Sequence, residues 1–93
     1  MRKFVIERDI PGAGAMTGEE ARAAAENSNA ALAKLAPRVQ WQQSHVAGDK
    51  IFCVYLAEDE TAIRDHSELS GIPITHIFEV DRVMDPNSQN AAR

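Results

Sequence analysis

The chain has 93 residues, enough for one domain with one hydrophobic core. Its net charge of -4 argues against binding to nucleic acid or to an anionic membrane, which needs clustered basic residues. The single cysteine, Cys53, excludes an internal disulfide and a thiolate metal cage. No apolar stretch approaches the ~20 residues of a membrane span. Glu7 and Asp9 interrupt the N-terminal apolar run, which is therefore not a signal peptide, and we expect a cytoplasmic protein.

The N-terminal part of the chain predicts a strand followed by a helix. Residues 3–8, KFVIER, form a β-branched and aromatic run typical of a strand, and the segment PGAG ends it. Thr17 and Glu20 have the spacing of a capping box, which predicts the start of a helix. An alanine-rich segment with apolar residues at helical spacing continues this helix to Leu35, and Pro37 stops it.

The rest of the chain predicts three strands and one more helix. Strands are expected over residues 39–46 and 51–56, joined by the tight turn AGDK. An acidic run opens a helix over residues 58–70, and a glycine ends it. The fourth strand is expected over residues 75–84, before a polar tail at 85–93. The order of elements is therefore β-α-β-β-α-β.

This order predicts an α+β fold, the ferredoxin-like βαββαβ sandwich. Its sheet has four antiparallel strands in the order 4-1-3-2, with both helices on one face. We expect a single ferredoxin-like domain at residues 1–84 and a C-terminal tail at 85–93.

The third strand is apolar on both faces, although the two helices can cover only one of them. A strand buried on both faces needs a cover on each. We therefore expect a homodimer through the sheet face, with a monomer carrying an apolar patch as the alternative. Ile51, Cys53 and Tyr55 fall on one face of this strand, and Phe52, Val54 and Leu56 on the other.

Two binding functions, of a nucleotide and of RNA, find little support in the sequence. Gly12 and Gly14 lack the third glycine of a dinucleotide fingerprint, so no nucleotide cofactor is expected. RNA-binding modules of this topology display aromatic residues on their first and third strands. Here Phe52 and Tyr55 alternate to opposite faces and the chain is acidic, so RNA binding is not expected.

Two carboxylates on neighbouring strands, Glu7 and Glu79, are candidate metal ligands. If Phe4 and Phe78 both point to the helices, Glu7 and Glu79 share the opposite face, where they need a cation, a shared proton or an arginine. Glutamate together with a histidine such as His45 suits a divalent transition metal. The alternative is that both carboxylates reach the solvated rim of the sheet.

A pocket between helix and sheet is the competing hypothesis. Asn29, Trp41 and His66 are the candidate lining residues, with His66 as a general base. Such a dimer would bind a small organic molecule, as cofactor-free oxygenases and isomerases of this fold do. The alternative for His66 is a boundary histidine that hydrogen-bonds to a backbone or hydroxyl group.

The segments FVIERDIPGAG, ENSNAAL, VQWQQSHV, DKIFCVYLAEDETAIRDH and FEVDRVMDP occur in that order along the chain. Together they resemble a small bacterial family of ferredoxin-like domains, long known only as a domain of unknown function. The resemblance implies a homodimer that binds nickel. From the resemblance we expect a divalent metal, nickel first. From the residues themselves we expect Glu7, His45 and Glu79 as ligands, with a partner subunit or water completing the shell. No catalytic residue, and no redox or hydrolytic chemistry, is expected.

Overall fold

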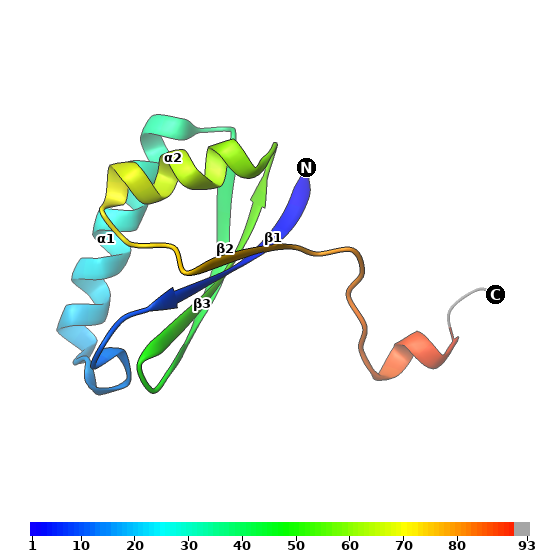
Figure 1. Ribbon diagram of the computed structural model, residues 1–93, viewed down its shortest axis with the longest axis horizontal. Helices are drawn as coiled ribbons and strands as arrows, with labels where there is room; N and C mark the ends of the chain where they lie inside the picture. The colour runs from blue at the N-terminus through cyan, green and yellow to red at the C-terminus, as the bar shows by residue number, and fades with distance from the viewer. Residues whose placement is uncertain (91–93) are drawn as a thin grey trace.

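The computed structural model describes residues 1–90 and has two layers, a sheet and a pair of helices (Figure 1). The elements are, in order, β1 (Arg2–Asp9), the 3₁₀ helix η1 (Ala13–Ala15), α1 (Gly18–Leu35), β2 (Val39–Ala47), β3 (Lys50–Ala57), α2 (Glu60–Ser70), β4 (His76–Glu79) and the 3₁₀ helix η2 (Pro86–Asn90).

The four strands form one antiparallel sheet in the order β2-β3-β1-β4, which confirms the predicted 4-1-3-2 ferredoxin-like topology. The sequence places β1 and β3 in the centre because both are apolar at alternate positions that face the helices. Phe4 and Ile6 of β1 and Tyr55 of β3 are at most 2% exposed. They form the core together with Ile63 of α2, so the core lies between the sheet and the helices.

Local signals fix both helix starts as expected. The Thr17 hydroxyl accepts a hydrogen bond from the Glu20 amide at 3.1 Å, and the Glu20 carboxylate accepts one from the Thr17 amide at 2.9 Å. This capping box satisfies two amides that the first turn of α1 would leave without partners. At α2 the Asp59 carboxylate accepts from the Ala62 amide at 2.9 Å. Gly71, with φ of 74°, ends that helix in the left-handed conformation that favours glycine.

The fourth strand is shorter than the predicted 75–84 because its pairing partner runs out. β4 pairs with β1 alone, and the pairing runs toward the N-terminal end of β1. The last backbone bond between the two segments, from the Val80 amide to the Lys3 carbonyl, lies one residue from the start of β1 at Arg2. The following segment leaves the body of the domain (Figure 1). The division into a domain at 1–84 and a tail at 85–93 stays a prediction, and residues 91–93 lie outside the described part.

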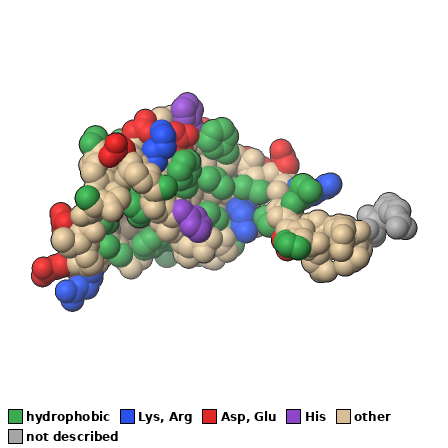
Figure 2. Space-filling model, turned by 90° about the horizontal axis from the view of Figure 1, so that it is seen from below, with side chains coloured by type: hydrophobic (Ala, Val, Ile, Leu, Met, Phe, Trp, Pro, Cys, Tyr) green, Lys and Arg blue, Asp and Glu red, His purple; other side chains and the backbone are tan. Residues whose placement is uncertain are grey.

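The sheet face away from the helices carries apolar side chains, as the two-sided pattern of β3 predicted. We call the apolar side chains on this face of the sheet the open-face patch. Hydrophobic side chains reach the molecular surface in the space-filling view (Figure 2). Phe78 is 53% exposed, and the other members are half-buried. The patch consists of Val5, Phe52, Val54, Leu56, Phe78 and Val80.

The loop after β1 packs closely against the β2–β3 turn, and this predicts the effect of one substitution. The Gly14 amide donates to the Gly48 carbonyl at 2.7 Å, and a Cβ on Gly14 would lie 3.0 Å from that same oxygen. We expect Gly14→Ala to lower the free energy of unfolding by about 1–3 kcal/mol, because the backbones must separate. Urea denaturation measures this.

Gly18→Ala is the matched control, since a Cβ at this first residue of α1 meets nothing within 4 Å. It should leave stability unchanged or raise it by up to about 1 kcal/mol. Equal losses in the two variants would contradict the close contact at Gly14.

Candidate functional site

Glu7 is the centre of a charged cluster on the open sheet face. Its Oε2 accepts a hydrogen bond from Lys50 Nζ at 2.6 Å, and its Oε1 lies 3.3 Å from His76 Nδ1. Lys50 also bonds to Asp9. The hydrogen bond from Lys50 lowers the pKa of Glu7 below its ordinary value, and partial burial opposes this shift. The charge of Lys50 and the contact with His76 lower the pKa further. Glu7 is therefore an ionised carboxylate with an imidazole beside it.

Glu79 does not belong to this cluster, and the prediction that it shares a face with Glu7 is wrong. The β1–β4 register pairs Glu79 with Phe4, on the helix side of the sheet, and pairs Phe78 with Val5 on the open side. Side chains alternate along a strand, so a difference of one residue in the assumed register exchanges the two faces. Glu79 instead forms an exposed ion pair with Arg2 at 3.7 Å.

His45 lies in the same row of the sheet as Glu7 but not beside it. His45 pairs with Phe52 of β3, which pairs with Glu7, which in turn pairs with His76. Two strand spacings of about 4.8 Å therefore separate His45 from Glu7. Across residues 1–90, no three histidine, cysteine or acidic side chains converge tightly enough to hold a metal ion. Of the predicted ligands, Glu7 has one potential metal-binding neighbour in direct contact, His76.

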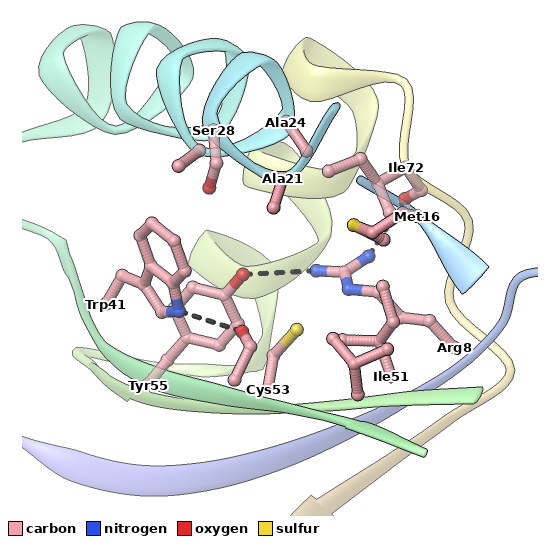
Figure 3. A pocket seen from close by; sticks show the side chains of 13 residues that line it. Arg8, Met16, Ala21, Ala24, Ser28, Trp41, Ile51, Cys53, Tyr55 and Ile72 are labelled. Carbon is pink, nitrogen blue, oxygen red and sulfur yellow. Dashed lines mark hydrogen bonds between the residues drawn. The ribbon is translucent and has the colours of Figure 1, made fainter. Parts of the chain in front are cut away.

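A second site is a cavity of about 220 Å³ between α1 and the sheet (Figure 3). Its walls are almost entirely apolar, and hydroxyl groups and one guanidinium supply the polar atoms. It reaches the surface, because Ala21 and Ala24 of α1 and Val46 of β2 are exposed. Lining residues also include Met16, Ser28, Trp41, Ser44, Ile51, Cys53, Tyr55 and Ile72.

Arg8 closes one end of this cavity and is only 1% exposed. Its Nη1 donates to the carbonyl oxygens of Ile72 and Pro73 at 2.9 and 3.0 Å. Its Nη2 lies 3.4 Å from the Tyr55 hydroxyl (Figure 3). Burial raises the pKa of Tyr55 to about 12, with the nearby Arg8 charge acting in the opposite direction, so this hydroxyl stays protonated.

His66 is buried and does not line the cavity, but it contacts two residues that do. Its Nε2 lies 3.2 Å from the Ser28 hydroxyl, and its ring contacts Tyr55 at a centroid separation of 5.3 Å. Burial lowers the pKa of His66, and the positive charge of Arg8 lowers it further. The imidazole is therefore neutral at neutral pH.

Of the three residues predicted to line a pocket, Trp41 lines the cavity and His66 contacts two of its lining residues from behind. Asn29 is an error, because it is exposed and lies outside the lining. It follows Ser28 by one residue, a rotation of about 100° around the helix that turns it away from the cavity. Trp41 is fixed by a hydrogen bond from its indole nitrogen to the Ser44 hydroxyl at 2.9 Å.

Two side chains of these candidate sites were not predicted from the sequence, for different reasons. Arg8 could have been found, because it alternates with the inward-facing Phe4 and Ile6 and therefore points to the core. Lys50 could not, since its contact with Glu7 depends on the β1–β3 register, which no local pattern reveals.

The neutral state of His66 predicts how stability depends on pH. The unfolded chain binds a proton at His66 near the ordinary pKa of about 6.5, whereas the folded chain resists it. This contribution to stability is thus fully present above about pH 6.5 and is lost as pH falls through the lowered folded pKa. Unfolding free energies measured by urea denaturation between about pH 8 and pH 5 should fall more steeply in the parent than in His66→Gln.

His45→Gln, which replaces an exposed histidine on the other face of the sheet, is the control for the substitution itself. The carboxylates that titrate at lower pH are common to all three proteins, so they cancel in the comparison. Arg8 of β1, Tyr55 of β3 and Ser28 of α1 face His66 and are unchanged in it. A parent and a His66→Gln variant with the same slope would show that His66 is not held neutral.

The chain is thus a small ferredoxin-like α+β protein with a carboxylate–imidazole pair on its open sheet face and an apolar cavity under its first helix. A family model described as SCO4226-like, nickel responsive protein SCO4226-like, matches residues 4–80. The chain belongs to this family.

A solved structure has the same fold. The crystal structure of SCO4226 from Streptomyces coelicolor A3(2) superimposes with a TM-score of 0.71 at 21% sequence identity. The match covers 88% of this chain and 99% of that one. No curated protein matches the sequence. Within residues 1–90, neither helix is long and apolar enough to cross a membrane.

Proposed function

We propose that this protein binds a divalent transition metal, nickel first, at the open face of its sheet, as a homodimer in the cytoplasm. The observation that carries the proposal is the contact of Glu7 with His76 on a face lined by apolar side chains. A carboxylate and an imidazole are ligands that nickel accepts. The name of the matched family, nickel responsive, supports the choice of metal.

The dimer would complete the ligand set. Sheets that stack face to face lie about 10 Å apart, so side chains from both inner faces meet between them. His45 lies in the row that contains Glu7 and His76, and its counterpart in a second copy is the candidate third ligand. The open-face patch supplies the apolar contact for such a dimer.

Lys50 competes with the metal, because its ammonium already occupies one oxygen of Glu7. Its two carboxylate partners, Asp9 first and then Glu7, raise the pKa of Lys50, so it remains charged at any pH at which the metal binds. A metal on Glu7 must displace this ammonium or share the carboxylate with it.

Calorimetric titration of tag-free, metal-depleted protein with nickel tests the proposal. Glu7→Gln and His76→Gln should each weaken binding by about 10- to 100-fold, the loss typical of damage to a metal's ligand environment. Lys50→Met should tighten binding, because it frees the Glu7 carboxylate.

Glu79→Gln is the matched control. It removes a carboxylate from the same pair of strands, but on the helix side of the sheet, so nickel affinity should not change. A parent protein that takes up no nickel would refute the metal function. Equal losses in the Glu7 and Glu79 variants would refute this location.

The cavity under α1 favours a second candidate function, the binding of a small organic molecule. Its volume of about 220 Å³ exceeds the 150 Å³ that accommodates benzene in an engineered cavity. This function does not depend on the metal, because the cavity and the Glu7 cluster lie on opposite faces of the sheet.

A further inference from the structure

Arg8 is a fully buried cation that has no counter-charge in the described part of the chain. None of the ion pairs among residues 1–90 includes it. Its neighbours in sequence, Glu7 and Asp9, alternate to the opposite face of the sheet and are occupied by Lys50. Burying an unpaired charge is costly, and carbonyl dipoles compensate for only part of that cost.

The guanidinium is held in one orientation with part of it unused. Its Nη1 is fixed by the two carbonyl groups of Ile72 and Pro73 in the loop before β4. Its Nε is buried without any hydrogen-bond partner, and its Nη2 has only the long contact to Tyr55. Nε and Nη2 lie along one edge of the guanidinium, the edge that binds a carboxylate through two parallel hydrogen bonds.

Arg8 is one of the residues that line the cavity, and the other walls of the cavity indicate what the rest of a ligand must be. Figure 3 shows the guanidinium at one end, with Trp41 toward the other end and Cys53 and Ala21 between them. The walls offer few polar atoms besides Arg8, so a phosphate, with more oxygens to satisfy, fits poorly. Scaled from benzene in 150 Å³, the volume accommodates roughly nine non-hydrogen atoms.

We propose that this cavity binds a small apolar monocarboxylate, of the size of benzoate, with its carboxylate on the Nε–Nη2 edge of Arg8 and its apolar body against Trp41. The inference rests on the small-molecule function proposed above and names its ligand class. Such a ligand supplies the counter-charge that Arg8 lacks and gives its Nε a partner.

The single tryptophan of the chain, Trp41, is a direct probe of the cavity. Benzoate is titrated against Trp41 fluorescence, with benzyl alcohol as a neutral molecule of the same ring and similar size. We expect saturable binding of benzoate at least about tenfold tighter than that of benzyl alcohol, as a bidentate charged contact provides. Benzoate should also raise the melting temperature, because it binds only the folded chain.

Variants locate the contact. Arg8→Met should remove the preference for benzoate over benzyl alcohol. Arg8→Lys keeps the positive charge but lacks the two-donor edge, so it should reduce the preference for benzoate over benzyl alcohol. This variant tests the same contact if Arg8→Met fails to fold. Ala24→Leu should block both probes by filling the cavity. Ala23→Leu, on the same turn of α1 but outside the lining, should bind both probes as the parent does.

Equal affinity for the two probes would overturn the carboxylate inference while leaving the cavity as a site for neutral molecules. Failure of both probes to bind would overturn the small-molecule function as well. Benzoate binding that survives in Ala24→Leu would place the ligand outside this cavity and refute the inference.

Discussion

Phe78→Glu should convert the proposed dimer into a monomer. Phe78 is the most exposed member of the open-face patch, at 53%, and lies beside Val5 on that face. In a sheet-to-sheet dimer, a glutamate here would lose its hydrating water where the parent buries an apolar side chain. We expect a cost of about 3 kcal/mol or more, which raises the dimer Kd by over a hundredfold. Sedimentation equilibrium over a range of protein concentrations measures this Kd.

Leu69→Glu is the matched control for this substitution. Leu69 is 48% exposed, much as Phe78 is, but lies near the end of α2 on the helix layer. Its substitution introduces the same charge and should leave the mass of the dimer unchanged. A parent protein that is monomeric at every concentration would refute the dimer. A dimer lost only in Leu69→Glu would place the interface on the helices.

Ile63→Ala should cause the largest loss of stability among these substitutions. Ile63 is 1% exposed and belongs to the core formed by Phe4, Ile6 and Tyr55. Truncation removes buried methyl groups and leaves a cavity, at a cost of about 2–5 kcal/mol. Because small domains are stable by only about 5–15 kcal/mol, much of the variant could unfold at physiological temperature. Urea denaturation measures the loss.

Leu69→Ala shortens an exposed apolar side chain on the same helix and is the control. It should cost less than about 1 kcal/mol, in line with surface substitutions. A similar loss for Ile63 and Leu69 would mean that α2 does not pack on the sheet through Ile63.

The element order and the sheet topology could be predicted because their signals are local. The capping box at Thr17, the glycine that ends α2 and the two-sided apolar pattern of β3 each depend on a few neighbouring residues. The short β4 could not be predicted in the same way. Its end depends on where β1 begins, since the register places Val80 opposite Lys3, one residue from the start of β1.

The candidate sites were predicted only in part, because they depend on which residues face each other across strands. Glu7 was chosen correctly as a member of the open face, whereas Glu79 was assigned to the wrong side by an error of one residue in register. His76 replaces it as the neighbour of Glu7, and Lys50 occupies that carboxylate. Inter-strand register is a property of the assembled sheet.

The sequence by itself determined the order of strands and helices, and from it the fold, because hydrophobic periodicity and capping act within a few residues. It also determined that Arg8 points inward, by its alternation with Phe4 and Ile6. Only the tertiary structure decided that this arginine lies beside an apolar cavity with one edge unpaired. That arrangement brings together α1, the sheet and the loop before β4, and long-range packing alone sets their distances.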